Sequence, residues 1–385
     1  MHIVLVTHHY LPEVGAPQRR WRSLVERFIA AGHQVTVLAP PPHYPSGRAC
    51  DLSPAERPRA TSTGPSGETI HRVRFREHGP DLKSRTLDQL RAAGDSVAVG
   101  RRRLRGARRP DVLIATAPGI PSIGAGFALS RWFRAPLVVE MRDAWPDLIT
   151  PSGMWGRPRR RGWRAAVTCV AHRLVTAGQR HAAAVVTTTD SFAGILRDRG
   201  MPRVDVVRNG ASLDQAPRVE APPERDELHV LYLGTTGRSQ GLTTAVHAAA
   251  LLHRRGVPVR LRIVGSGYED ALLRAEAHAL AAPVEFVGRI PRAQVEAQYD
   301  WADTVLVSLR AWDPFEWTVP SKLYEAMVAG RHICASLSGE AALVVRQAGV
   351  GDTVPPEQPT ALADLWAGSP PTDRACGWAT AAGAG

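Results

Sequence analysis

Short apolar runs rich in β-branched residues alternate with helical patterns along the chain, and this alternation limits the folds open to it. Within each half, a strand-like run is followed by a loop, a helix and another strand. Such repetition is typical of parallel sheets covered by helices. We predict an α/β fold of two Rossmann-like, doubly wound domains that face a central cleft, where ligands bind beyond the carboxyl ends of the strands. The predicted strands are residues 3–7, 35–38, 112–116, 137–140, 185–188, 204–207, 228–233, 259–264, 284–287 and 304–308.

The length of 385 residues also favours more than one domain. Residues 211–227 contain three prolines and no periodicity, so they are the predicted linker. The first domain then covers residues 1–210 and the second covers residues 228–370, followed by a short Gly/Ala-rich tail at 371–385. Residues 51–69 are polar and turn-rich, and they are predicted to form a long loop.

Charge is divided unevenly between the two halves. Residues 1–210 carry 33 Arg and Lys against 16 Asp and Glu, a balance of +17, whereas residues 211–385 carry 15 against 20, a balance of −5. An anionic partner of the first half is therefore expected, with a merely solvated basic face as the alternative. The four cysteines lie far apart, which indicates a reducing, cytoplasmic compartment. The amino terminus lacks signal-peptide features, and glycines and prolines interrupt the longest uncharged run, so no transmembrane segment is predicted.

Two arginine clusters carry much of this positive charge. One runs from Arg101 to Arg109, and the other begins at Arg157 and continues into an amphipathic helical pattern that reaches Leu174. Such a helix can lie on an anionic leaflet, so we expect a protein bound peripherally to the inner face of the cell membrane. The alternative is that the apolar face packs on the domain's own sheet.

The segment WDPFEWTVPSKLYEAMVAG, residues 312–330, contains a helix that begins near Pro320 and Ser321. Free N–H groups at a helix start attract phosphate, and Lys322, one of two lysines in the chain, adds a positive charge there. Glu325, one turn further on, can accept hydrogen bonds from the hydroxyls of a ribose. These features fit a nucleotide sugar, and they equally fit a capped helix whose first turn Glu325 stabilises.

The chain resembles family 4 glycosyltransferases, which have two Rossmann-like domains in the fold called GT-B. The resemblance rests on PSKLYEAMVAG and on segments in family order, among them IVLVTHHYLPEVGAPQRR, PPHYPSGR, VVEMRDAWPD, LYLGTTGRSQGL and IVGSGYED. It points to the branch that transfers amino or deoxy sugars in surface-polysaccharide pathways. It implies that the second domain binds a nucleotide sugar, with UDP as the default, and that the first binds the acceptor. The implied reaction is retaining transfer to a hydroxyl of a lipid-linked or polysaccharide-precursor acceptor.

The resemblance also suggests roles for particular residues. Lys322, Arg142 and Asp143 are the expected catalytic residues, because Arg142 can bind an acceptor phosphate and Asp143 can orient or deprotonate its hydroxyl. His8, His9 and Arg142 are expected to line the acceptor site, although lone histidines are more often structural. The expected donor-binding residues are Gly15, Arg238, Gln240, Gly265, Glu316, Pro320, Ser321, Lys322, Leu323 and Glu325.

The family's first glutamate falls on Trp317, and its phosphate-binding Arg and Lys fall on Thr235 and Gln240, so Arg238 is expected to serve the diphosphate instead. The chain has no Asp-x-Asp, and therefore no metal or other cofactor is expected. The alternatives are transfer to a small soluble acceptor, epimerisation of a sugar nucleotide, an inactive partner subunit and nucleic-acid binding, for which no recognised motif is present.

Overall fold

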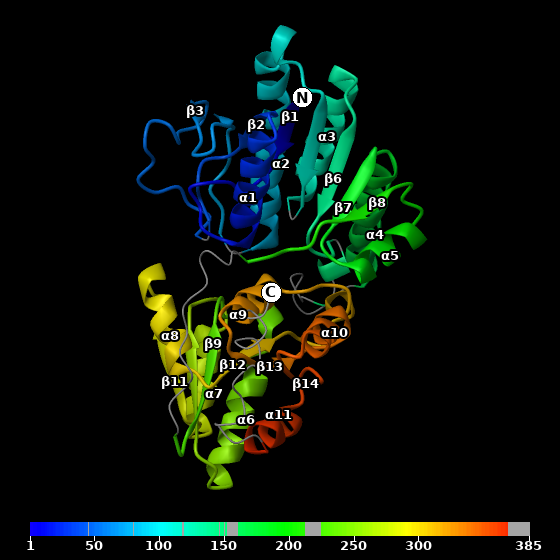
Figure 1. The fold of residues 1–385 in the computed structure, drawn as a ribbon. Helices are drawn as coiled ribbons and strands as arrows, with labels where there is room; N and C mark the ends of the chain where they lie inside the picture. Colours follow the sequence, from blue (N-terminus) through cyan, green and yellow to red (C-terminus); the bar gives the residue numbers. More distant parts are fainter. Residues whose placement is uncertain are drawn as a thin grey trace, which may run out of the picture. The chain divides into compact units, whose positions relative to one another are not determined.

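The computed structural model describes residues 1–44, 46–79, 81–117, 119–145, 147–149, 151, 161–211 and 225–368. The chain divides into two compact units, Met1–Arg208 and Asn209–Gly385 (Figure 1). Most of the predicted linker and all of the predicted tail at 371–385 lie outside the described residues.

The first domain is built on a sheet that is parallel except for one edge strand. Its described strands follow the spatial order β3-β4-β2-β1-β5-β6-β7-β8, so β1 lies between β2 and β5 and the chain changes direction there. The strands are β1 (His2–Val6), β2 (Gln34–Ala39), β3 (Thr61–Thr63), β4 (Thr69–Arg72), β5 (Val112–Thr116), β6 (Leu137–Met141), β7 (Ala184–Thr187) and β8 (Val204–Val206). The helices are α1 (Ala16–Ala30), α2 (Leu82–Arg103), α3 (Ile120–Phe133), α4 (Arg161–Arg180) and α5 (Asp190–Asp198).

Periodicity explains how these elements bury their apolar side chains. In α1, Trp21 and Val25 are four residues apart and therefore lie on one face, which packs with Ile3 and Leu5 of β1. The central strand β1 is buried along its whole length, which is why its sequence is continuously apolar rather than alternating.

The second domain has a sheet in which all recorded strand pairs are parallel, in the order β11-β10-β9-β12-β13-β14. The strands are β9 (Leu228–Leu233), β10 (Val259–Val264), β11 (Val284–Gly288), β12 (Thr304–Ser308), β13 (His332–Ser336) and β14 (Gly351–Val354). The helices are α6 (Thr243–Arg254), α7 (Asp270–Ala279), α8 (Val295–Trp301), α9 (Ser321–Val328), α10 (Gly339–Ala348) and α11 (Pro359–Ala367). The small buried residues Ala245, Ala248 and Ala249 of α6 belong to the same core as Trp366 of α11.

The prediction of two doubly wound α/β domains is confirmed, and several strand bounds, such as 112–116 and 228–233, match the prediction residue for residue. The predicted loop at 51–69 is partly wrong, because β3 forms inside it. The β-branched residues Thr61 and Thr63 make an antiparallel pairing with β4, and this tertiary contact outweighs the turn-rich composition. Of the described helices, none combines the length and the apolar character that a bilayer crossing demands.

Candidate functional site

The carboxyl edge of the second sheet collects most of the predicted donor residues. β9 and β12 are neighbours at its centre, and the chain continues from β9 to β10 on one side and from β12 to β13 on the other. In sheets of this kind ligands bind beyond the carboxyl ends of the strands, at the point where the chain direction changes.

Glycines let the loops after β9 and β10 pack backbone against backbone. Gly265 has φ +133°, and a Cβ at this position would lie 1.9 Å from the carbonyl oxygen of Gly234. A Cβ on Gly267 would lie 2.5 Å from the carbonyl oxygen of Thr236. Any side chain at these two positions would therefore force the loops apart.

Lys322 lies in the first turn of α9 and reaches the end of β9. Its Nζ donates a hydrogen bond to Tyr232 Oη at 2.5 Å and lies 4.3 Å from the centre of the Tyr232 ring. The Tyr232 hydroxyl in turn donates to the carbonyl of Thr235 at 2.7 Å. Burial lowers the pKa of Lys322 from its ordinary value of 10.5 to about 7, and the Glu325 carboxylate only partly opposes this shift. The ammonium is thus close to its titration point at neutral pH.

Arg238 is exposed in the loop that follows β9. It donates to the hydroxyl of Tyr268 at 2.8 Å, and its guanidinium carbon lies 4.4 Å from the centre of that ring. Gln240, which ends the same loop, uses its Oε1 to accept the N–H of Gly237 at 3.0 Å and so closes its own turn. Of these two predicted donor residues, Arg238 therefore presents its charge at the surface, and Gln240 is engaged within the loop.

The other predicted donor residues in this domain lie around α9. Pro320 precedes the helix, and its carbonyl accepts the N–H of Leu323 at 3.0 Å. The Leu323 side chain is completely buried, so it contributes to the core rather than to an open surface. Ser321 and Glu325 are half-buried in the first turns. Glu316 is exposed, and its backbone carbonyl accepts the N–H of Glu340 at 2.9 Å.

In the first domain, Gly15 immediately precedes α1 with extended backbone, and a Cβ there would lie 2.5 Å from Gln18 Oε1. Arg142 and Asp143 directly follow β6, as predicted. Arg142 Nη2 lies 3.4 Å from Asp143 Oδ2, whereas the buried Nη1 has no hydrogen-bond partner among the described residues. This weak pairing between neighbours leaves the guanidinium capacity for a further anionic partner.

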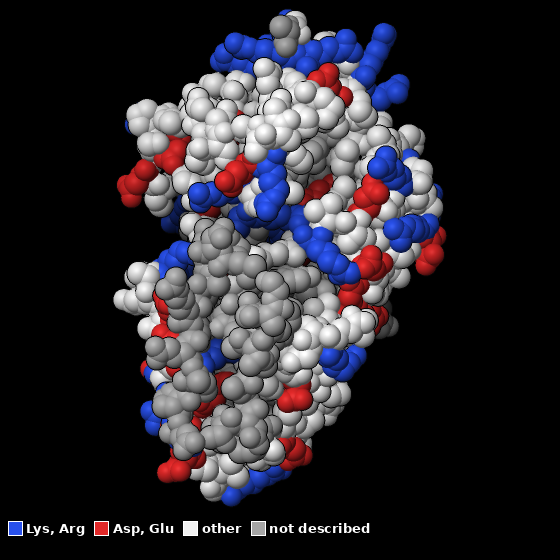
Figure 2. Space-filling model, viewed as in Figure 1, with Lys and Arg blue, Asp and Glu red and all other residues white. Residues whose placement is uncertain are grey.

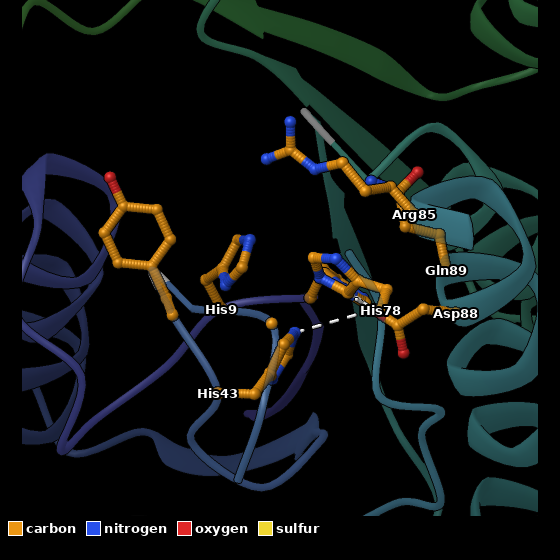
Figure 3. A pocket seen from close by; sticks show the side chains of 9 residues that line it. His9, His43, His78, Arg85, Asp88 and Gln89 are labelled. Carbon is orange, nitrogen blue, oxygen red and sulfur yellow. Dashed lines mark hydrogen bonds and ion pairs between the residues drawn. The ribbon is translucent and has the colours of Figure 1, made fainter. Parts of the chain in front are cut away.

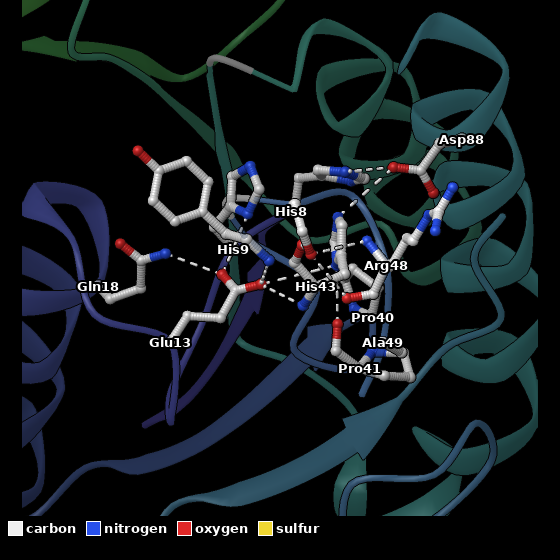
Figure 4. A network of polar contacts seen from close by, with 12 residues as sticks. His8, His9, Glu13, Gln18, Pro40, Pro41, His43, Arg48, Ala49 and Asp88 are labelled. Carbon is white, nitrogen blue, oxygen red and sulfur yellow. Dashed lines mark hydrogen bonds and ion pairs between the residues drawn. The ribbon is translucent and has the colours of Figure 1, made fainter. Parts of the chain in front are cut away.

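His8 and His9, expected as lone histidines, instead belong to a cluster of four histidines and two carboxylates, which Figure 3 and Figure 4 show between them. His9 Nδ1 lies 3.1 Å from Glu13 Oε2, and His8 Nε2 lies 2.9 Å from Asp88 Oδ2. The sequence did not reveal this cluster, because its members are far apart in the chain: Asp88 follows His8 by 80 residues. His43 completes the link between the two carboxylates, at 3.5 Å from Asp88 and 3.6 Å from Glu13.

Titration of the cluster follows from burial and hydrogen bonding. Burial lowers the pKa of His8 to about 4, more than its hydrogen bond to Asp88 can raise it. Burial opposes ionisation of Asp88, yet the hydrogen bonds from His43 and His8 hold the pKa of its carboxyl well below the ordinary value. At neutral pH Asp88 is therefore ionised.

A basic surface lies where α2 ends, and Figure 2 shows lysine and arginine side chains gathered over this end of the first domain. Arg101 stacks on Trp132 at 3.6 Å from the ring centre, and Trp132 is 51% exposed. Arg105, Arg109 and Arg134 line a hollow of about 380 Å³ beside this tryptophan. The predicted second cluster begins at Arg157, and Arg157, Arg159 and Arg160 lie outside the described residues; of the described side chains of α4, Val170 is 53% exposed.

Sequence reasoning did not select several residues of these sites. The segment PPHYPSGR carries His43 and Gly47, so one signal was present, whereas Asp88 lies on a long helix with no motif around it. Tyr232 has no signal in the sequence beyond its place in a strand, and only the fold shows that its hydroxyl contacts Lys322.

Comparison with known proteins agrees with this architecture. A glycosyl transferase 4-like domain matches residues 15–210, and a domain of glycosyl transferases group 1 matches residues 227–367. The putative colanic acid biosynthesis glycosyltransferase WcaL of Escherichia coli is 32% identical over 182 residues, which are 46% of this chain and 44% of WcaL. The chain thus spans less than half the length of this relative.

Two solved structures are similar in fold. Sucrose-phosphate synthase from Thermosynechococcus elongatus has a TM-score of 0.70 at 18% identity, covering 98% of this chain and 96% of its own. Anabaena HepE in complex with UDP has a TM-score of 0.62 at 15% identity, covering 95% and 89%. With both domain matches in chain order, the protein belongs to the glycosyltransferases that join a glycosyl transferase 4-like domain to a group 1 domain in the GT-B fold.

Proposed function

We propose that the protein is a retaining glycosyltransferase that moves a sugar from a UDP-sugar to a hydroxyl of a lipid-linked or polysaccharide-precursor acceptor. The observation that carries this proposal is the half-buried Lys322 at the start of α9, beside loops whose glycines let main chain pack against main chain. A lysine that titrates near neutral pH, next to the N–H groups of a helix start, can gain a proton when an anion binds and release it when the anion leaves.

The second domain would hold the donor diphosphate without a metal ion. Lys322 and the first N–H groups of α9 are suited to the phosphate oxygens, Arg238 offers a further exposed cation, and Glu325 suits the ribose hydroxyls. A bound diphosphate would favour the ammonium form of Lys322 and so stabilise the departing charge. The UDP complex of the similar HepE supports this choice of nucleotide.

The first domain would hold the acceptor. The unpartnered Nη1 of Arg142 suits an acceptor phosphate, and the exposed carboxylate of Asp143 suits the attacking hydroxyl. The basic surface with Trp132 fits an anionic leaflet, where each nearby cation contributes about 1 kcal/mol. We therefore place the enzyme on the cytoplasmic face of the cell membrane, and the name of WcaL supports a surface-polysaccharide acceptor.

The decisive experiment measures transfer with a panel of UDP-sugars, with and without short polyprenyl-diphosphate-linked sugars. Lys322→Ala should lose at least about 100-fold in turnover, comparable to removal of one preorganised donor from an active site. Lys83→Ala is the matched control, because Lys83 is exposed in the first turn of α2 and is the other lysine of the chain.

Two of the alternatives have outcomes of their own. A new sugar nucleotide formed from the donor alone would show an epimerase, and donor binding by neither variant nor wild type would show an inactive subunit. Equal turnover of Lys322→Ala and Lys83→Ala would remove Lys322 from the reaction. The anomeric configuration of the product, determined by NMR, tests retention directly.

A further inference from the structure

The histidine cluster of the first domain contains one point at which several ring nitrogens meet. The Nε2 atoms of His8, His43 and His78 lie 2.9, 3.5 and 3.8 Å from a single atom, Asp88 Oδ2 (Figure 3). These residues come from four separate segments, since His8 follows β1, His43 follows β2, His78 precedes α2 and Asp88 is on α2. We propose that this cluster is a binding site for one divalent transition-metal ion of the Zn²⁺ type.

Ring tautomers favour this assignment. His43 Nδ1 lies 2.8 Å from the carbonyl of Pro41, and His78 Nδ1 lies 2.8 Å from the carbonyl of Gly79. A carbonyl only accepts, so both Nδ1 atoms carry a proton, and the Nε2 atom of each neutral ring is the one left to bind an ion. Metal-bound histidines typically donate their second N–H to a carbonyl in this way. The buried His43 Nε2 faces Asp88 Oδ2 at 3.5 Å.

Asp88 is fully buried, and its described ion-pair partners are all histidines. A divalent cation at this point would pair with the carboxylate and take a lone pair from each neutral ring that binds it.

The distances suit a tetrahedral ion. With bonds of roughly 2.0–2.2 Å to nitrogen and oxygen, the edge of a regular tetrahedron is roughly 3.3–3.6 Å. The distance from His43 Nε2 to Asp88 Oδ2, 3.5 Å, matches this edge, and that from His8 Nε2, 2.9 Å, is shorter. The ligand atoms of His8, His43 and Asp88 all lie within 4.8 Å of one another, whereas His78, at 3.8 Å from Asp88 Oδ2, is not part of that group. The pocket beside them has a volume of about 20 Å³, which is room for one water molecule or one ion.

Supporting contacts hold the ligands in place. Asp88 Oδ1 accepts the backbone N–H of Arg76 at 3.0 Å, which fixes the carboxylate. Gly47, with φ +75°, packs on His78, because a Cβ there would lie 2.6 Å from the imidazole ring. The glycine of PPHYPSGR is therefore needed for the position of His78.

The neighbouring group of His9, Glu13 and His43 does not serve as well. Both oxygens of Glu13 are occupied, since Oε1 accepts the N–H groups of His43 and Tyr44 and Oε2 contacts Gln18 and His9. This carboxylate therefore fixes the loop, and the ion belongs at Asp88. The proposed site uses residues of the first domain only, and none of them is among the residues proposed above to hold the donor diphosphate.

The test uses the full chain, freed of any affinity tag and stripped with a chelator, titrated with Zn²⁺ in a calorimeter and with Co²⁺ in a spectrophotometer. We expect one ion per chain and the intense visible absorption of tetrahedral Co²⁺. His43→Ala and the isosteric Asp88→Asn should each weaken binding at least about 100-fold, the upper range for loss of a supporting partner. His253→Ala, an exposed histidine at the end of α6, is the control and should bind as wild type does.

Circular dichroism of each stripped variant separates loss of ligand from loss of fold. If Asp88→Asn is folded and binds Zn²⁺ as wild type does, or if the stripped wild type binds no ion at micromolar concentrations, the proposal is wrong. Inactive enzyme that still binds one ion per chain would count against the proposed function and leave this site intact.

Discussion

Replacing Lys322 by methionine should make the free protein more stable, although we propose that it removes a donor-binding group. The fall of the Lys322 pKa from 10.5 to about 7 corresponds to about 5 kcal/mol by which the surroundings disfavour the ammonium. This figure is already net of the groups that favour the charged form, among them the Glu325 carboxylate. It is therefore the full cost of the ammonium at a pH below 7.

Methionine removes this cost and leaves little unsatisfied, because the Tyr232 hydroxyl still donates to Thr235. At pH 6 we expect the free energy of unfolding to rise by up to about 5 kcal/mol, or up to about 10–20 °C in Tm for a domain of this size. The unfolded state holds the proton up to pH 10.5 and the folded state releases it near pH 7. The cost is thus complete below pH 7 and disappears as pH rises toward 10.5.

Urea unfolding from pH 6 to pH 10 measures both effects, and the exposed Lys83→Met should change stability by no more than about 0.5 kcal/mol. A Lys322→Met protein that is less stable than wild type at pH 6, or whose difference does not change with pH, would refute the reasoning.

Further predictions concern the acidic range, a glycine contact and the basic surface. Burial raises the pKa of Glu13, but hydrogen bonds, first from His9, outweigh it and lower the pKa to about 2, so Glu13→Gln should lose about 3 kcal/mol at pH 7. Because this stabilisation is present above pH 4.5 and is lost as pH falls toward 2, the difference in unfolding free energy should shrink over that range; a constant difference would contradict it. Gly265→Ala should lower the free energy of unfolding in urea by at least about 3 kcal/mol, since its Cβ would meet a carbonyl oxygen. Gly256→Ala, with open space around it, should lower it by only about 1 kcal/mol. Equal losses of stability in the two variants would exclude the steric explanation. Trp132→Ala should reduce flotation with anionic liposomes several-fold without changing stability, and undiminished flotation would show that the tryptophan does not contact lipid.

Periodicity and composition predicted the fold well, because parallel strands such as 112–116 are buried on both faces and therefore have continuously apolar sequences. The strand β3 carries no such signal. It forms at an edge of the sheet, where polar threonines suffice, and pairing with β4 rather than burial selects it.

The site was only partly predictable for a similar reason. Lys322 and the start of α9 are local features, so a short segment of sequence contains them. The histidine cluster joins His8, His43 and Asp88, which are neighbours only after β1, β2 and α2 have assembled. Likewise, the sequence near Gln240 does not reveal that its side chain closes its own loop.

The contact of Gly265 with Gly234 restricts how this protein can diverge. No other residue fits between those two stretches of main chain, whereas Arg238 and Tyr268 project from the same loops and tolerate replacement sterically. If these loops bind the sugar nucleotide, a new donor preference would arise by substitution of the projecting side chains, while the glycines and the main chain stay the same. Randomised libraries aimed at altered donors should spare the glycines and vary those two positions.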